Sequence, residues 1–390
     1  MTNGVKGLTD KTSLVHAGRS ATRFNGAVNP PIKRASTILA KHPDELYAGP
    51  KSLYGRLGTE VHDVLIDGLK ALETAEFVQL SANGLSACSM AMASCVTAGD
   101  HFLLTDAAYG PTRRFVQRHL KKMGVSHTIF DPRISASELE ALIRPETKAV
   151  FFESPGSLTF ELSDIEALLP VCRAHELVTI ADNTWGAGIC YHPLKLGFDL
   201  SVQALTKYVI GHSDGFGGMV ATNRSDLARK LKETAEDWGM TISPDDAYLA
   251  QRGLRTLHNR IKAQGKSSVE LATWLEAHPQ VQQVMHPALP SHPDHHIWKR
   301  DFDGTAGLFG FCLKETDQTK IYEALTSLDL FGFGFSWGGF ESLILPCEPQ
   351  LKRTQSPKWK QPHGYLLRIN TGLESTEDLI GDLDRFLANL

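Results

Sequence analysis

Two residues of complementary chemistry follow neighbouring apolar runs of the chain. Asp182 closes the run at 177–182, and Lys207 lies three residues beyond the run at 200–204. A lysine amine there can form an imine with an aldehyde, and a nearby carboxylate can keep a pyridine nitrogen protonated, so that the ring accepts electrons. Taken singly, such an Asp more often caps a turn and such a Lys lies on the surface. At the ends of buried strands, however, both side chains are expected to reach one crevice.

Small residues upstream could hold the anionic end of such a ligand. The segment 81–87 reads Ser-Ala-Asn-Gly-Leu-Ser-Ala and places Gly84 and Leu85 where a helix would begin. The free N–H groups and the dipole of a helix N-terminus favour an anion, although many similar loops only start a helix. Thr206 could add a hydroxyl to a phosphate. Tyr109 is placed to stack on an aromatic ring, although a lone Tyr in a loop more often only packs.

A parallel sheet is the element that would bring these residues together. Residues 59–253 alternate short apolar runs with amphipathic stretches, which is the α/β pattern. In such sheets the ligand lies outside the carboxyl ends of the strands. Ser135 and Ser163 are each followed three residues later by Glu, which predicts a capping box at each helix start. The predicted strands are 101–105, 149–153, 177–182 and 200–204, and the predicted helices are 135–143 and 163–169.

Three segments of different pattern predict the domain organisation. Residues 1–58 carry little periodicity and predict an extended N-terminal arm, which another surface such as a second subunit would order. Residues 59–254 predict an α/β domain that holds the ligand. Residues 255–390 predict a smaller α+β C-terminal domain. The elements expected in this last domain are a helix around 267–278, a strand at 308–313 and a final helix at 374–383.

Charge and hydropathy exclude several classes of partner. The 390 residues include 40 Lys plus Arg and 44 Asp plus Glu, so the formal charge of -4 gives no basic field for nucleic acid. No apolar run is long enough to span a bilayer, and the first residues lack the pattern of a signal or transit peptide. We therefore expect no membrane partner and a cytoplasmic location.

Cysteine and histidine spacing gives no indication of a metal site. The six cysteines are widely spaced and form no Cys-x-x-Cys pair, so buried reduced thiols are expected. The stretch with His286, His292, His295 and His296 lacks the paired spacing of zinc ligands, and its prolines indicate a loop. We predict that no metal is bound.

Several short motifs occur in one order along nearly the whole chain. They are Tyr54-Gly55-Arg56-Leu57-Gly58-Thr59, Asn83-Gly84-Leu85, Tyr109-Gly110-Pro111-Thr112, Glu153-Ser154-Pro155-Gly156, Asp182-Asn183-Thr184, Thr206-Lys207-Tyr208 and Leu367-Arg368-Ile369-Asn370-Thr371-Gly372-Leu373-Glu374. In these motifs the chain resembles the γ-family of pyridoxal 5'-phosphate (PLP) enzymes of cysteine and methionine metabolism. The resemblance implies the type I fold, with a mostly parallel central sheet of the seven-stranded type and helices on both faces.

The same resemblance implies roles for particular residues. Lys207 would carry PLP as a Schiff base and serve as the general base, with Asp182 on the ring nitrogen. Tyr109 would stack on the ring and help to deprotonate the incoming amine. Tyr54 and Arg56 would reach the cofactor phosphate of a neighbouring subunit, so an active dimer, assembled into a homotetramer, is expected. The implied substrate-binding residues are Arg368, which would clamp the α-carboxylate, and Ser336, Trp337, Ser157 and Tyr54.

Local features favour one reaction within the family. Trp337 stands where γ-eliminating members usually carry a small aliphatic residue, Ala204 where many of them carry Ser, and Pro111 where methionine-cleaving members carry Cys. The resemblance therefore implies β-elimination of L-cystathionine to homocysteine, pyruvate and ammonia, a step of methionine biosynthesis by transsulfuration. γ-Elimination or γ-replacement on the same scaffold is the first alternative. A regulator that binds PLP without turnover is the second.

Overall fold

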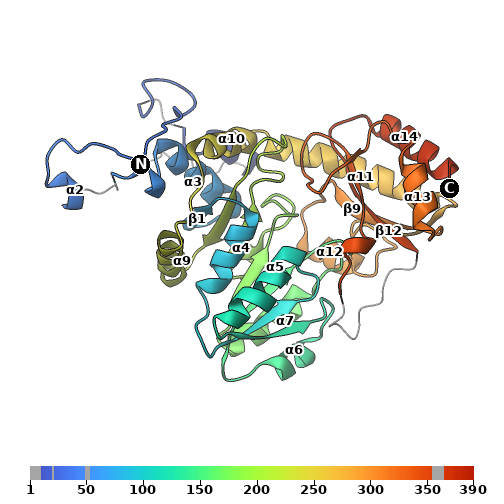
Figure 1. Ribbon diagram of the computed structural model, residues 1–390, viewed down its shortest axis with the longest axis horizontal. Coiled ribbons are helices and arrows are strands. Elements are labelled where there is room, and N and C mark those ends of the chain that lie inside the picture. Colours follow the sequence, from blue (N-terminus) through green and yellow to red (C-terminus); the bar gives the residue numbers. More distant parts are fainter. Residues whose placement is uncertain (1–9, 20–21, 49–52, 354–363) are drawn as a thin grey trace.

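A seven-stranded sheet forms the larger part of the computed structural model, which describes residues 10–19, 22–48, 53–353 and 364–390 (Figure 1). The strand order is β1-β7-β6-β5-β4-β2-β3. Neighbouring strands run parallel from β6 to β3, whereas β7 is antiparallel to both β1 and β6. The predicted mostly parallel central sheet is thus confirmed. The strands are β1 (Phe77–Ser81), β2 (His101–Thr105), β3 (Ser126–Phe130), β4 (Thr147–Glu153), β5 (Val178–Asp182), β6 (Leu200–Ala204) and β7 (Gly218–Thr222).

Helices cover both faces of this sheet, as predicted. The alternation of strand side chains sends Phe102 and Leu104 into a core with α4 (Gly84–Ala93) and α9 (Ser225–Asp237). Leu103, between them, faces the opposite core with α6 (Ala136–Leu142) and α7 (Ile165–Ala174). A third core packs α3 (Glu60–Glu73) and α10 (Pro244–Leu254) against β1 and β7. The other helices of this part are α1 (Asp10–His16), α2 (Glu45–Ala48), α5 (Gly110–Phe115), α8 (Pro193–Leu196) and the short η1 (Gly55–Leu57) and η2 (Val116–Leu120).

A second sheet of five strands, in the order β10-β11-β12-β9-β8, forms the smaller C-terminal part. Its core buries Phe309, Phe311 and Leu367 against the long helix α11 (Leu257–Ala277), α13 (Gln318–Leu325) and α14 (Thr376–Ala388). Figure 1 shows α11 extending from the larger part into the smaller one. The remaining elements are β8 (Val281–Met285), α12 (His295–Asp301), β9 (Leu308–Leu313), β10 (Gly332–Phe333), β11 (Leu343–Pro346), η3 (Glu348–Gln350) and β12 (Tyr365–Asn370).

Of the chain before α3, α1 packs against α3 and buries Leu14 in the core, whereas α2 lies far out from the sheet (Figure 1). Leu39 is 87% and Tyr47 96% exposed, so these apolar side chains contact little of their own chain. Residues 1–9, 20–21 and 49–52 of the predicted arm lie outside the described residues. Within the described residues, no helix combines the length and hydropathy that crossing a membrane requires.

One of the two predicted capping boxes is present. Ser135 Oγ accepts a hydrogen bond from Glu138 N, and the Glu138 carboxylate accepts one from Ser135 N. The capping box predicted at Ser163 is wrong. Ser163 is buried, its N–H donates to Ser154 Oγ at 3.2 Å, and α7 begins at Ile165 with Asp164 as its N-cap residue. A tertiary contact has replaced the local cap there.

Candidate active site

A cavity of about 350 Å³ lies beyond the carboxyl ends of β4, β5 and β6. One side is formed by the larger sheet and its loops, and the other by Leu308, Phe335, Trp337 and Arg368 of the C-terminal part. This is the position expected for a ligand in a parallel α/β sheet. The sequence-predicted residues that line it are Gly84, Leu85, Tyr109, Ser157, Asp182, Thr206, Lys207, Trp337 and Arg368.

Lys207 reaches the cavity from the loop after β6. Its Nζ donates a hydrogen bond to Ser336 Oγ at 2.8 Å and lies 5.3 Å from the centre of the Trp337 ring. Burial is the main cause that lowers the pKa of this amine to about 8, and the charge of Arg368 lowers it further, whereas Asp182 raises it. Only a neutral amine attacks an aldehyde, so this lysine is more reactive near neutral pH than an exposed one.

Asp182 ends β5 and is fixed by two neighbours. Its Oδ1 accepts hydrogen bonds from Thr184 N at 3.0 Å and Thr184 Oγ1 at 2.6 Å, and its Oδ2 faces the Cys88 thiol at 3.6 Å. Burial raises the pKa of this carboxyl, and the Thr184 hydrogen bonds oppose that effect. Glu153 lies directly across on β4, and burial together with the charge of Asp182 raises its pKa well above the usual range. A cation beside Asp182 would therefore stabilise the carboxylate.

The N-terminus of α4 supplies the anion end of the cavity. Asn83 caps this helix by accepting from Ser86 N, and the next N–H, that of Ala87, donates to Asn83 O. The N–H groups of Gly84 and Leu85, in contrast, have no acceptor among the residues that the structure describes. A Cβ at Gly84 would lie 2.3 Å from the Cβ of Ala204, so glycine is required for α4 to approach β6 this closely.

Thr206 stands beside this helix end. Its hydroxyl donates to Gly217 O at 3.2 Å and accepts from Gly217 N at 3.1 Å. The loop that carries Lys207 is thereby tied to the start of β7. Thr206 lines the cavity, and its hydroxyl would have to share these bonds with a phosphate.

Arg368 lies on β12 and is buried, with 8% of its surface exposed. Its Nη2 donates to the carbonyl oxygens of Phe335 at 2.9 Å and Ser336 at 3.3 Å. Those bonds fix the guanidinium plane and leave the other N–H donors for a ligand in the cavity. Ser336 bonds to Lys207, but it is not part of the cavity wall itself.

Tyr109 precedes α5 and is 48% exposed at the mouth of the cavity. Its N–H donates to Glu153 Oε2 at 2.7 Å, which fixes the backbone of the loop. Burial is the main cause that raises the pKa of its phenol, and the charge of Glu153 raises it further. Ser157 follows on the neighbouring loop, where its N–H donates to Ala107 O.

Tyr54 and Arg56 lie outside this cavity. Tyr54 is 47% exposed, and the Arg56 guanidinium sits 5.6 Å from the centre of its ring. Arg56 lines a different, smaller depression with Thr241 and Ile242. Their expected role at the site of a neighbouring subunit stays a prediction.

Two residues of the site were not identified as such from the sequence. Cys88 faces Asp182 from α4, and Glu153 lies opposite Asp182 while it holds the N–H of Tyr109. The sequence could have identified Glu153 as a site residue, because it ends the predicted strand 149–153 just as Asp182 ends the strand 177–182. Nothing in the sequence marks Cys88 as a site residue, since a Cys within a helix of small residues is expected in the core.

The predicted His-rich loop has a structural role. His286 is fully buried and shares a hydrogen bond with Ser268 Oγ at 3.1 Å, and His292 accepts from Asp294 N at 3.1 Å. Within the described ranges, no group of three or more His, Cys, Asp or Glu residues is arranged to hold a metal ion. All six cysteines are free, and five of them are buried.

The donor set fits PLP. Two unpaired N–H groups at a helix N-terminus suit the phosphate, a buried carboxylate suits a protonated ring nitrogen, and an amine of lowered pKa suits the aldehyde. All three line a single cavity.

The chain belongs to the Cys/Met metabolism PLP-dependent enzyme family, whose model matches residues 11–388. Its relatives include cystathionine beta-lyase MetC of Escherichia coli K12, 40% identical over 97% of this chain and 98% of that protein. The L-alanine/L-glutamate racemase of Wolbachia pipientis wMel is 35% identical over 98% of each. The crystal structure of metB from Corynebacterium glutamicum superposes with a TM-score of 0.90 at 30% identity and covers 98% of both chains.

Proposed function

We propose that this enzyme catalyses the β-elimination of L-cystathionine to homocysteine, pyruvate and ammonia. The observation that carries the proposal is one cavity in which Lys207, Asp182 and Arg368 converge beside the free N–H groups of α4. The 40% sequence identity between this chain and a relative named cystathionine beta-lyase supports L-cystathionine as the substrate. When bound, PLP supplies an aldehyde for Lys207 and a ring that withdraws electrons from the substrate Cα.

The residues of the larger domain hold the cofactor in this proposal. The N–H groups of Gly84 and Leu85 and the hydroxyl of Thr206 would bind the phosphate, and Asp182 would hold the ring nitrogen. Tyr109 would pack against the ring. Because its phenol has a raised pKa, its help in deprotonating the substrate amine is expected to increase at alkaline pH.

The remaining residues act on the substrate. Arg368 binds the α-carboxylate through the N–H donors that face the cavity, with Ser157 on the adjoining wall. Lys207 Nζ would take the proton from Cα and return it to the sulfur as the Cβ–S bond breaks, so that the sulfur leaves as a thiol. Water would then complete the release of pyruvate and ammonia. Ser336 Oγ accepts a hydrogen bond from Nζ at 2.8 Å and would orient the amine.

Trp337 supports β- over γ-elimination. Loss of a γ-substituent requires a second proton to be removed, at Cβ, so the base must reach two carbon atoms. The Trp337 ring lies 5.3 Å from Lys207 Nζ and packs edge-on against Tyr208, so its bulk occupies one side of the amine. A single deprotonation at Cα is the chemistry that this arrangement favours.

Product analysis tests the proposal. L-Cystathionine incubated with the PLP-loaded enzyme should give pyruvate and homocysteine, which chromatography separates from 2-oxobutyrate and cysteine. The γ-products would refute the β-assignment. Bound PLP that yields no keto acid from any thioether would instead favour a regulator without turnover. Lys207→Ala, prepared in parallel, is the control that should form no product.

Racemisation needs the same removal of the Cα proton, and a relative is named a racemase, so the assay should include it. L-Alanine is incubated with the enzyme, and D-alanine is measured by chiral chromatography. We expect pyruvate from cystathionine to form much faster than D-alanine. The reverse ratio would contradict the proposed function while leaving the roles of Lys207 and Asp182 intact.

We further propose that the active unit is a dimer, assembled into a homotetramer. Tyr54 and Arg56 lie outside the cavity of their own chain, on an arm that carries exposed Leu39 and Tyr47. A second subunit would bury these apolar side chains and receive Tyr54 and Arg56 at its phosphate site. Mixing inactive Arg56→Ala and Lys207→Ala subunits should then restore about a quarter of the sites, because half of the dimers are hybrids with one intact site. No recovery after verified subunit exchange would contradict the shared site.

The free thiols support a reducing compartment, and we propose the cytoplasm. Immunodetection in fractionated cells of the source organism tests this, and recovery outside the cytoplasmic fraction would contradict it.

A further inference from the structure

The loop after β4 forms one wall of the active-site cavity. Gly156, Ser157, Leu158 and Phe160 all line that cavity. Two of these residues have a left-handed backbone, with φ of 71° at Leu158 and 58° at Phe160. Residues other than glycine rarely adopt such angles, which persist only where the surrounding structure enforces them. Contacts from outside the loop must therefore hold it in this shape.

Thr159, between the two strained residues, contacts a buried ion pair. Its hydroxyl donates to Glu161 Oε2 at 2.6 Å and accepts from Arg353 Nη1, and the same Nη1 donates to Glu161 Oε1 at 2.5 Å. All three residues are at most 6% exposed. Within the loop, Gly156 N donates to Glu161 O and Phe160 N to Gly156 O, each at 2.9 Å. One guanidinium therefore joins both polar side chains of the loop.

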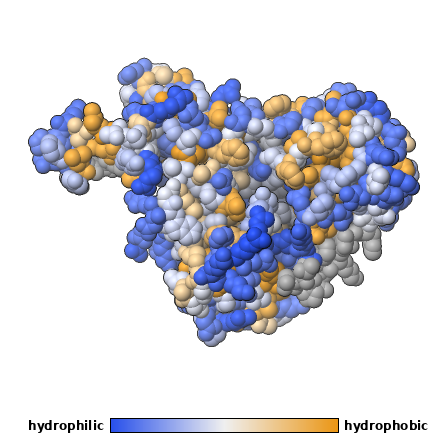
Figure 2. All heavy atoms as spheres, viewed as in Figure 1, coloured by the Kyte–Doolittle hydropathy of each residue, from blue (hydrophilic) through white to orange (hydrophobic). Residues whose placement is uncertain are grey.

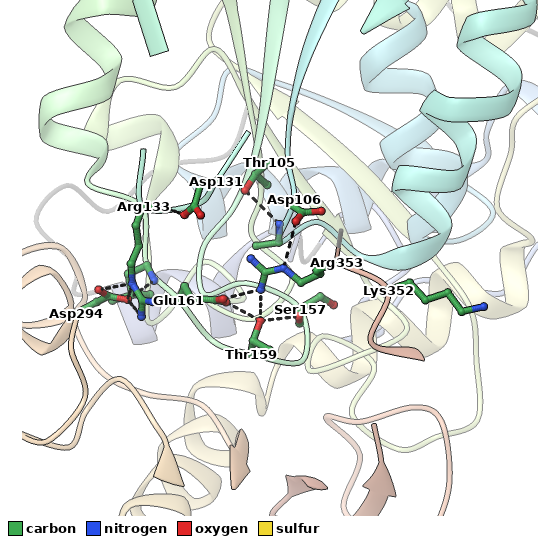
Figure 3. Close-up of polar contacts among 12 residues, drawn as sticks. Thr105, Asp106, Asp131, Arg133, Ser157, Thr159, Glu161, Asp294, Lys352 and Arg353 are labelled. Carbon is green, nitrogen blue, oxygen red and sulfur yellow. Dashed lines mark hydrogen bonds and ion pairs between the residues drawn. The ribbon is translucent and has the colours of Figure 1, made fainter. Parts of the chain in front are cut away.

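Arg353 reaches the loop from the C-terminal part, in the stretch after η3. Its Nε lies 3.7 Å from Asp106, which follows β2 and pairs with Arg113 at 3.1 Å. Figure 3 shows Arg353 between Asp106 and the loop. Figure 2 shows hydrophilic side chains gathered over α5, whereas Arg353 has only 6% of its surface exposed. A cation this deeply buried is stable only because its partners are in place.

Asp294, also of the C-terminal part, anchors the other end of the loop. Its Oδ2 accepts a hydrogen bond from Leu162 N at 3.0 Å, and Figure 3 shows it on the far side of Glu161 from Arg353. The C-terminal part thus holds the loop at two points. Of these two anchors, Arg353 is the one that contacts Thr159, between the two residues of left-handed backbone.

We propose that Arg353 is a positioning residue of this enzyme. Through Thr159 and Glu161 it holds the strained loop against the cavity, and it thereby places Ser157 and Leu158 beside the substrate. The inference rests on the proposed function, in which Ser157 belongs to the wall that receives the substrate. Arg353 is not part of that wall and acts only through the loop.

Loss of this contact should affect substrate binding more than the chemical step. Without the guanidinium, the loop can relax from its left-handed angles, and the wall moves away from the substrate. Lys207 and Arg368, which act on the proton and the α-carboxylate, belong to other segments and keep their own contacts. The substrate should then bind more weakly but react at a similar rate once bound.

Four variants of the holoenzyme test this. Arg353→Met removes the guanidinium, Thr159→Val removes only the hydroxyl that it meets, and Thr159→Ser keeps that hydroxyl. Arg300→Met is the control, because it breaks a different link between the C-terminal part and the larger domain, the ion pair with Asp164 at 2.8 Å. Initial rates of pyruvate release should give a KM for L-cystathionine roughly tenfold higher in the first two, with kcat within about twofold. Thr159→Ser and Arg300→Met should stay near the wild type.

The comparison of KM with kcat separates positioning from stability. A variant that is partly unfolded has fewer active sites, which lowers kcat and leaves KM unchanged. That result in Thr159→Val, or an equal rise of KM in Thr159→Ser, would refute the inference. Thr159→Val keeps the ion pair of Arg353 with Glu161, so it tests the contact even if Arg353→Met does not fold.

Binding of L-norleucine, which has no leaving group, is measured independently through the visible absorbance of the bound cofactor. Its dissociation constant should rise in Arg353→Met and Thr159→Val and stay near the wild-type value in Arg300→Met. This rise would support the positioning role even if cystathionine gave no keto acid and the proposed function failed. Unchanged binding in both variants would overturn the inference even if cystathionine is cleaved.

Discussion

Replacing Arg368 by Lys and by Met separates its charge from its geometry. Both variants remove the guanidinium that lies on β12 at the wall of the active-site cavity. Lys keeps one positive charge but has no planar fork of donors. Met keeps the length of the side chain and removes the charge. We expect both to bind PLP, because Arg368 is placed at the substrate end of the cavity.

The magnitude follows from the donors that remain. Arginine has five N–H donors, and Nη2 directs its two toward the carbonyl oxygens of Phe335 and Ser336. Three donors are left, enough for a two-point contact with a carboxylate, and each such bond to a charged group contributes about 1.5–3 kcal/mol. Arg368→Met should therefore lower kcat/KM for cystathionine by roughly 10² to 10⁴. Arg368→Lys, which loses one bond, should lower it by about tenfold to a hundredfold.

Pyruvate release, coupled to lactate dehydrogenase and followed through NADH absorbance, measures these losses. Circular dichroism and the visible absorbance of the bound cofactor verify that each variant is folded and loaded. A near-normal rate for Arg368→Met would refute the assignment of the α-carboxylate to this residue. Equal losses in Lys and Met would show that the fork, and not the charge, supplies the whole effect.

Three further predictions concern titration and stability. Burial lowers the pKa of Lys207 to about 8 in the cofactor-free protein, so the rate of PLP uptake should rise with pH and reach half its maximum near pH 8. Cofactor absorbance measures this rate, and a midpoint above pH 10 would contradict the prediction. Arg353→Met removes one partner of a buried ion pair with Glu161 and should cost about 3–5 kcal/mol of unfolding free energy in urea titrations, and a loss below about 1 kcal/mol would show that the network relaxes. Burial lowers the pKa of His286 from 6.5 in the unfolded chain to about 3 in the folded protein. Between these two pH values the unfolded chain binds a proton that the folded protein excludes, so the free energy of unfolding falls as the pH drops from 6.5 toward 3. His286→Asn should flatten that slope in acid denaturation.

The strands and the residues at their ends could be predicted because apolar runs and polar termini are local signals. The strands expected at 101–105 and 200–204 coincide with β2 and β6, and Asp182 ends β5 as expected. The helix expected around 267–278 begins ten residues earlier, at Leu257. Its first half packs Leu257 and Ile261 against the larger domain, so it lacks the one-sided polarity by which a surface helix is recognised.

Contacts between segments far apart in the sequence could not be predicted, because no local pattern indicates them. The hydrogen bond from Lys207 to Ser336 joins residues 129 positions apart, and the thiol of Cys88 meets Asp182 across 94 positions. The hydrogen bond from Arg113 Nη1 to Lys352 O joins α5 to the stretch after η3 across 239 positions. The motifs indicated which chemistry to expect, but only the fold shows which of these distant residues meet.

The candidate active site lies at the junction of the two domains. Lys207 and Asp182 belong to the larger domain, whereas Ser336, Trp337 and Arg368 come from the C-terminal part. Two further bonds hold this junction, from Trp185 Nε1 to Leu308 O and from Gly307 N to Tyr208 Oη, each at 2.9 Å. Since the proton acceptor and the groups that orient the substrate lie on opposite sides of it, a small shift would move the base relative to Cα and Cβ. Reaction specificity in this enzyme should therefore respond more to substitutions at this junction than to changes around the cofactor ring.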